Sequence, residues 1–214
     1  FRYVISKQTA SFTSIVKDGK ELLALPAKLS YFRAPTDNDR NVKALWDRTN
    51  IWQGENFDCV FGKVYSCAVS DNRVTFTCSA AGVSRKPFFN YTLEYGFFAD
   101  GSVSVSLGGK IRENVIWLPR LGFEFTLPAD SDKFSYFGLG PFESYTDMRH
   151  HGYIGTHESN ADREYVNYVM PQEHGNHFAC KELAIDGSFS VTAENTMEIS
   201  VLHHSIEQLT AARH

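Results

Sequence analysis

The chain has 214 residues, of which 43% are hydrophobic and 21% charged, and its formal net charge is −4. Its 17 Phe, 10 Tyr and 3 Trp exclude an intrinsically disordered chain, because disordered chains lack the aromatic residues that build a core. No apolar run approaches the length of a membrane span, and the slightly acidic balance gives no electrostatic reason to expect a nucleic acid or a membrane as partner. Length and composition favour a single globular domain over residues 1–214.

Hydrophobic and polar residues alternate with a period of two in several segments, which is typical of half-buried β-strands. Turn sequences lie between these segments, and three of them contain Asp-Gly, a strong hairpin signal because glycine adopts a positive φ without steric penalty. The pattern therefore predicts an all-β chain folded as an antiparallel sandwich or barrel. The predicted strands are residues 74–79, 91–95, 103–107, 121–127, 189–193 and 197–201, and the turns are residues 17–20, 71–72, 99–102 and 185–188.

Helix is expected only near the end of the chain, where Ser205 can cap a helix over residues 205–209 and Gln208 can complete a capping box. Residues 33–56 and 138–177 show no alternation. Long irregular segments in a compact domain are usually functional or cover other parts of the fold. Candidate sites are therefore expected in these two segments.

Metal and nucleophile signals are weak. The eight His match no metal-binding motif, and the adjacent His203 and His204 would point to opposite faces of a strand. The four Cys form no C-x-x-C pair and are expected to be free, small buried residues. A G-x-S-x-G nucleophile motif is absent. We expect no metal site in this chain.

Carboxylates allow two interpretations. Asp37 and Asp39 flank Asn38, and Glu143 and Glu173 lie in the second irregular segment. Glycoside hydrolysis needs two carboxyl groups on opposite sides of the scissile bond, but the sequence alone places no two of these at such a separation. The alternative is that Asp37, Asn38 and Asp39 pin a tight loop through local hydrogen bonds.

An arginine lies beside the same loop. Arg33 stands among apolar residues and is expected to form a structural ion pair with a carboxylate.

Five segments resemble, in the same order, motifs of the C-terminal domain of lacZ-type β-galactosidases, glycoside hydrolase family 2. The family motifs are R-A-P-x-D-N-D, P-R-[IL]-G, G-x-G-P-x-E-x-Y, P-Q-E-x-G-N and A-x-R-H. The matching residues are Arg33–Asp39, Pro119–Gly122, Gly138–Tyr145, Pro171–Asn176 and Ala211–His214.

The resemblance implies a large antiparallel sandwich of the galactose-mutarotase-like kind, a supersandwich, which is truncated here at its C-terminus. It also implies a parent enzyme that hydrolyses terminal β-D-galactosides with retention, through a glutamate nucleophile and a glutamate acid/base. Both glutamates belong to a catalytic barrel outside this chain, so no catalytic residue is assigned here. Two departures put family ion pairs in question: His177 replaces a common Arg, and Met148 an often basic residue.

In the family, the loop after the first motif lies toward the mouth of the catalytic barrel. The resemblance therefore implies a substrate-rim loop carrying Asn41, Lys43 and Trp46, with Trp46 as the candidate for stacking on a sugar. Core packing of Trp46 is the alternative. Trp52 is expected to be a buried aromatic that anchors the far end of this loop.

Further expectations follow from the resemblance. The partners are the catalytic barrel and a galactoside substrate, and the parent is expected to be a homo-oligomer. Its Mg²⁺ or Na⁺ would be bound by residues outside this chain, which itself needs no cofactor. The expected compartment is the cytoplasm, with the periplasm as alternative. Two other functions stay open: a stand-alone carbohydrate-binding sandwich and a mutarotase-like isomerase, since fold does not imply function.

Overall fold

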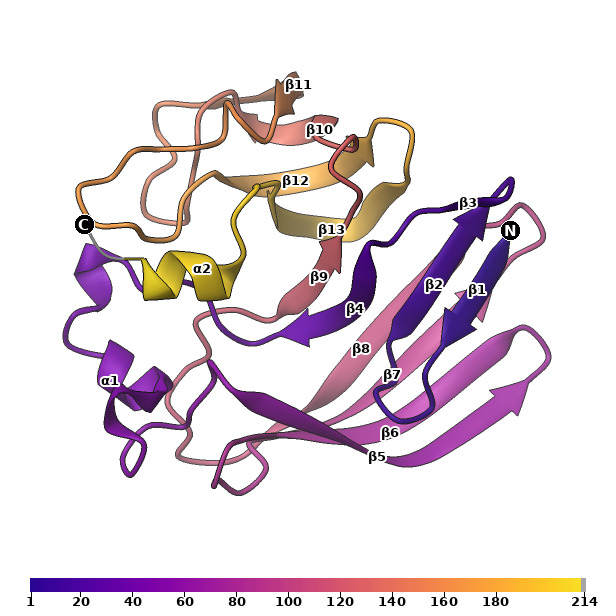
Figure 1. Ribbon diagram of the computed structural model, residues 1–214, viewed down its shortest axis with the longest axis horizontal. Helices are drawn as coiled ribbons and strands as arrows, with labels where there is room; N and C mark the ends of the chain where they lie inside the picture. The colour runs from indigo at the N-terminus through magenta and orange to yellow at the C-terminus, as the bar shows by residue number, and fades with distance from the viewer. Residues whose placement is uncertain (213–214) are drawn as a thin grey trace. The chain divides into compact units, whose positions relative to one another are not determined.

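The computed structural model describes residues 1–212, and these residues form β-strands joined by short turns (Figure 1). All strand pairs are antiparallel, so the prediction of an all-β class is confirmed. The strands are β1 Arg2–Ile5, β2 Phe12–Lys17, β3 Lys20–Glu21, β4 Leu25–Ser30, β5 Val60–Ser70, β6 Arg73–Gly82, β7 Phe89–Phe97, β8 Val103–Ile111, β9 Gly122–Thr126, β10 Lys133–Gly140, β11 Tyr153–Asn160, β12 Asn176–Ile185 and β13 Ser190–Ser200. The helical segments are η1 Asp37–Asp39, α1 Lys43–Trp46, η2 Arg48–Asn50 and α2 Ile206–Ala211.

The chain divides into two compact units. The first comprises Phe1–Arg33 and Asn38–Thr126, and the second comprises Ala34–Asp37 and the described residues from Leu127 onward. Each is described by itself below. The expectations of one domain over residues 1–214 and of a supersandwich stay predictions.

The first unit contains the sheets β1-β2-β3, β4-β9 and β5-β6-β7-β8. Its core is aromatic and lies between β2 and the inner face of the β5–β8 sheet. Phe12 packs edge-on against Tyr95 at 4.8 Å between ring centroids, and the buried Tyr95 hydroxyl donates to the Ala10 carbonyl at 2.8 Å. Such aromatic pairs favour edge-to-face geometry because the positive ring edge meets the negative face.

The second unit contains the sheet β11-β10-β12-β13 and the helix α2. Phe134, Tyr136, Cys180, Ile185 and Ile199 form its buried hydrophobic cluster. These residues come from β10, β12 and β13. Phe134 and Tyr136 are alternate residues of one strand and share a face of the sheet, whereas a register shift lies between Cys180 and Ile185.

Most of the predicted elements are present. The Asp18-Gly19 turn joins β2 to β3 with both residues at positive φ, 51° and 82°, as a two-residue hairpin requires. Gly101 and Gly187 also have positive φ in their turns. The capping box of Ser205 and Gln208 starts α2 as predicted.

The predictions for two segments were incomplete. The two strands predicted over residues 189–193 and 197–201 are parts of one strand, β13. The alternation is interrupted between them because the pairing of β13 with β12 shifts register on either side of Cys180. Residues 138–177 are not irregular throughout, because they include β11. This strand was missed because it lies at the sheet edge, where polar residues occupy both faces.

None of the helices in the described part of the chain is long and apolar enough to cross a membrane.

The four cysteines are free thiols, with Cys78 and Cys180 buried and Cys59 and Cys67 half-buried. Burial raises the pKa of Cys180 to about 12 and also raises that of Cys78. At pH 8 a thiol with a pKa of about 12 is a thiolate in roughly one molecule in ten thousand. We therefore expect a maleimide to modify Cys59 and Cys67 of the native chain and to spare Cys78 and Cys180. Peptide mass spectrometry checks this, and equal modification of all four thiols would contradict it.

Candidate functional site

The loop that follows β4 is held by an ion pair within the first unit. Arg33 Nη1 donates to Asp39 Oδ2 at 2.7 Å and Arg33 Nη2 donates to Asp39 Oδ1 at 3.0 Å. Asp39 is only 5% exposed, and the bidentate geometry satisfies both of its oxygens. The ion pair expected for Arg33 is therefore present.

Asp37 and Asn38 are exposed, and each lies in the short helix η1. Within the second unit, the backbone N–H of Asp37 donates to the side-chain oxygen of Gln172 at 2.9 Å. Gln172 belongs to the P-Q-E-x-G-N motif. Two of the family-like motifs thus meet in space, although 135 residues separate them. The loop-pinning role of Asp37, Asn38 and Asp39 stays a prediction.

Of the two tryptophans of this segment, Trp46 is buried, as its core-packing alternative predicts, and Trp52 is exposed, against expectation. Trp46 is fully buried, with the guanidinium of Arg33 at 5.5 Å from its ring and Trp117 edge-on at 4.5 Å. Of the two readings left open for Trp46, the structure shows core packing, and the buried indole presents no face to a sugar in this chain. Trp52, expected to be a buried anchor, is 82% exposed. The reason is that α1 turns its last residue inward, whereas Trp52 lies in the turn after η2.

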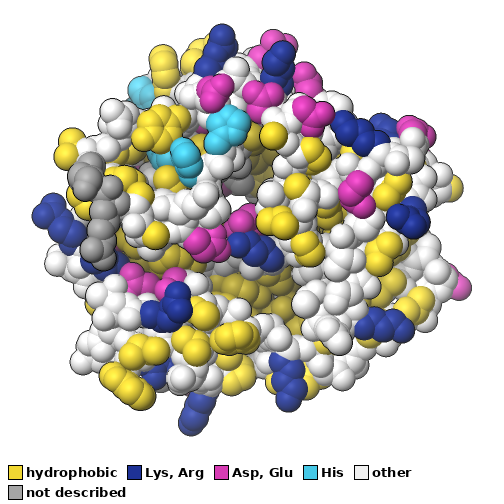
Figure 2. Space-filling model, in the orientation of Figure 1, with side chains coloured by type: hydrophobic (Ala, Val, Ile, Leu, Met, Phe, Trp, Pro, Cys, Tyr) yellow, Lys and Arg dark blue, Asp and Glu magenta, His cyan; other side chains and the backbone are white. Residues whose placement is uncertain are grey.

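Asn41 and Lys43 are exposed at the start of α1. Leu45 and Ile51 add apolar surface beside Trp52, and Figure 2 shows hydrophobic side chains gathered over the segment that carries α1 and η2. This surface has the polar and apolar character of a rim, but the substrate-rim role of Asn41 and Lys43 stays a prediction.

Tryptophan fluorescence tests these two environments. We expect acrylamide to quench Trp52 most strongly and Trp46 least, because a collisional quencher must reach the indole. Trp52→Phe should remove the most accessible part of the emission, and Trp46→Phe should remove the least accessible part. Stern–Volmer plots of the two variants provide the measurement, and the reverse assignment would contradict the structure.

Glu143 is the centre of a hydrogen-bond network in the second unit. Its carboxylate accepts hydrogen bonds from the Tyr145 hydroxyl at 3.2 Å, from the backbone N–H of Gly175 at 2.9 Å and from the Tyr168 hydroxyl. Burial and the hydrogen bond to Glu143 raise the pKa of Tyr168 to about 12. Burial also raises the pKa of Tyr145. Glu143 thus joins the G-x-G-P-x-E-x-Y motif to the glycine of P-Q-E-x-G-N, and its oxygens are committed to internal donors.

His177 lies in a second network, which the sequence did not predict. The imidazole is fully buried between the Glu164 carboxylate, 2.8 Å from Nε2, and the Tyr136 hydroxyl, 2.9 Å from Nδ1. Glu164 is 5% exposed and also accepts a hydrogen bond from the Ser159 hydroxyl. At the position where the family commonly has Arg, His177 therefore contacts a buried carboxylate, that of Glu164. The sequence signalled an unusual site through His177, which stands where the family commonly has Arg. It gave no sign of the partner, because Glu164 lies in a segment without hydrophobic alternation or a motif.

Three of the other histidines, His174, His203 and His204, line one small pocket, where the Tyr165 ring contacts the rings of His174 and His204. His203 and His204 follow β13 in a bend, and His203 Nε2 lies 3.1 Å from the exposed carboxylate of Asp162. Among the described residues, no group of three or more His, Cys, Asp or Glu could hold a metal ion. Arg213 and His214, which complete the A-x-R-H motif, lie outside the described residues.

A family model described as "Beta galactosidase small chain" matches residues 1–214, the full length of the chain. The chain belongs to this family. Among curated relatives, the β-galactosidase of Actinobacillus pleuropneumoniae is 31% identical over 100% of the chain. The β-galactosidases of Streptococcus thermophilus and Staphylococcus xylosus are 28% and 27% identical over 100% and 99% of it. The chain spans about 21% of the length of these relatives.

The family-like motifs contain polar residues that contact one another within this chain. Arg33 contacts Asp39, Asp37 contacts Gln172, and Glu143 contacts Gly175. In each of these contacts the acceptor oxygen receives a hydrogen bond from a donor of the chain itself.

Proposed function

We propose that this chain is the C-terminal, small-chain domain of a β-galactosidase that hydrolyses terminal β-D-galactosides with retention. The match of the family over residues 1–214 carries the proposal. In a retaining glycosidase one carboxylate forms a covalent glycosyl-enzyme, and a second acts first as acid and then as base. We assign neither role to this chain, since Asp39 and Glu143 are occupied by internal donors.

The proposed role of the chain is that of scaffold and part of the active-site rim. The exposed segment with Asn41, Lys43 and Trp52 supports this role, because aromatic and polar side chains on a loop suit contact with a sugar or with a neighbouring domain. The parent enzyme, meaning the longer β-galactosidase that contains this chain, would supply the catalytic barrel. It would also supply the ligands of any Mg²⁺ or Na⁺ and the contacts of a homo-oligomer.

We expect the purified chain to leave a chromogenic β-galactoside unhydrolysed, because it lacks both catalytic carboxylates. The parent enzyme should hydrolyse the same compound, and NMR of the first-formed sugar should show the β-anomer. Turnover by the chain alone, abolished by replacing one of its own carboxylates, would contradict the proposal. A parent enzyme that releases the α-anomer would contradict the retaining mechanism.

A further inference from the structure

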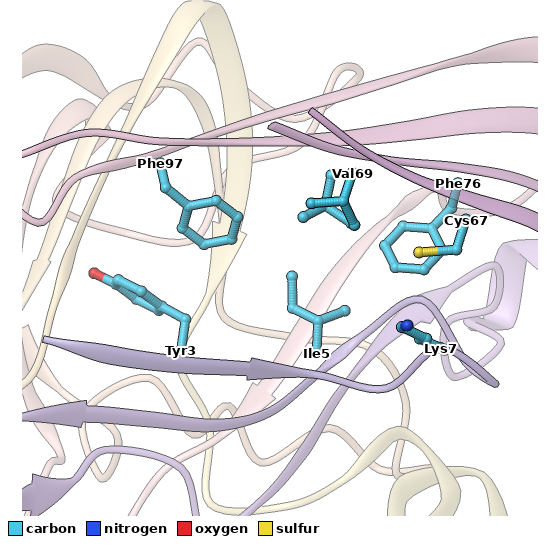
Figure 3. Close-up of a pocket in the computed structure, with 8 residues that line it drawn as sticks. Tyr3, Ile5, Lys7, Cys67, Val69, Phe76 and Phe97 are labelled. Carbon is cyan, nitrogen blue, oxygen red and sulfur yellow. The ribbon is translucent and has the colours of Figure 1, made fainter. Parts of the chain in front are cut away.

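The first unit contains an apolar groove that its own strands leave open. Its volume is about 460 Å³, and its lining is formed by Tyr3 and Ile5 of β1, Cys67 and Val69 of β5, Val74 and Phe76 of β6 and Phe97 of β7. Figure 3 shows the side chains of β1 pointing toward those of the facing strands, with Lys7 at one end. An exposed apolar groove marks a candidate site of interaction.

Both strands that border the groove are sheet edges. β1 pairs only with β2, and β5 pairs only with β6. Val69 pairs with Val74, so both face the inner side of the sheet, yet Val69 is 67% exposed. An edge strand with exposed apolar side chains is a template for a further strand, because its outer N–H and C=O groups have no partner within the sheet.

We propose that an extended segment of the parent β-galactosidase, from outside these 214 residues, lies in this groove and pairs with the free edge of β5. This inference rests on the proposed function, which makes the chain part of a longer enzyme. The segment would carry apolar side chains at alternate positions toward Val69 and Cys67. It would carry an acidic residue toward Lys7, whose charge lies at the end of the groove.

Two observations favour this occupant over a small apolar molecule. The chain spans about 21% of the length of its relatives, so most of such an enzyme lies outside it. An apolar molecule would fill the groove but would leave the outer backbone groups of β5 without partners. A strand satisfies both requirements, since it supplies side chains to the groove and hydrogen bonds to the edge.

A photo-crosslinker tests the occupant in the full-length parent enzyme. p-Benzoylphenylalanine at position 69 should cross-link to a peptide outside residues 1–214 of the same molecule. Position 105 is the matched control. Val69, Val74, Tyr95 and Val105 form one cross-strand row, so Val105 faces the same side from β8, the opposite edge, and is 45% exposed. It should not capture that peptide. Three cross-linking results would overturn the inference: adducts only within residues 1–214, adducts to a second copy, or equal adducts from both positions. A co-purified small molecule without any peptide adduct would overturn it as well.

Cys67 gives an independent measurement. In the native parent enzyme its reaction with a maleimide should be at least tenfold slower than in the Val69→Arg variant, which would displace the segment. Val105→Arg should leave Cys67 protected. Equal reactivity in the wild-type enzyme and Val69→Arg would overturn the inference. Hydrolysis of a β-galactoside is assayed separately: an inactive parent refutes the proposed function, whereas an active parent without the cross-link refutes only the segment.

Discussion

His177→Leu is expected to destabilise the protein by about 3–5 kcal/mol, because it removes the imidazole that contacts a buried carboxylate and a buried hydroxyl, and buried polar groups without partners are costly. Glu164 would lose its contact with Nε2 while remaining 5% exposed, and the Tyr136 hydroxyl would lose its partner as well. The free energy of unfolding from urea titration, followed by circular dichroism, provides the measurement. The double variant His177→Leu/Glu164→Leu should recover part of the loss, because apolar residues can replace a buried pair at little cost.

A second His–carboxylate pair of the same unit provides the control. His203 and Asp162 are 3.1 Å apart, but their side chains are 47% and 80% exposed. His203→Leu should therefore change the free energy of unfolding by less than about 1 kcal/mol, as is usual for surface pairs. If His177→Leu and His203→Leu lowered the free energy of unfolding equally, burial would not explain how much His177 contributes to stability.

Glu143→Ala is expected to cost about 2–4 kcal/mol, because three donors lose a charged acceptor at once. The N–H of Gly175 is buried, and the Tyr145 and Tyr168 hydroxyls are half-buried, so water can replace the carboxylate only in part. Glu158→Ala is the control, since Glu158 is exposed in the edge strand β11 of the same sheet and should cost less than about 0.5 kcal/mol. A loss below 1 kcal/mol for Glu143→Ala would contradict the central place of this carboxylate.

Alkaline titration checks the same network. The pKa of Tyr168 is raised from 10.0 to about 12 by burial and by its hydrogen bond to Glu143. A raised pKa means that the folded state favours the neutral phenol, so this contribution to stability is complete below pH 10 and is lost between pH 10 and 12. In Glu143→Ala the phenol should ionise at lower pH, which the ultraviolet absorbance of phenolate reports.

Local features of the sequence determined the strands, the hairpins and the cap of α2. The alternation at residues 74–79 and 103–107 marks a face of each strand, and Asp18-Gly19 fixes its turn through backbone sterics. Ser205 and Gln208 cap a helix through neighbours three residues apart. Each of these signals acts over a few residues, so it can be read without knowing the rest of the fold. Each of the five motifs is also a short local pattern, and their shared order along the chain indicated the family.

Only the tertiary structure decided which tryptophan is buried and which partners His177 and Glu143 have. Whether Trp46 or Trp52 is buried depends on how α1 packs, because both are tryptophans in one irregular segment. The partner of His177 is 13 residues away in an irregular segment, and that of Glu143 is 32 residues away at Gly175. The groove exists only because side chains of β1 face those of β5, β6 and β7, which belong to a separate sheet. Burial and pairing are properties of distant segments brought together, and no local pattern encodes them.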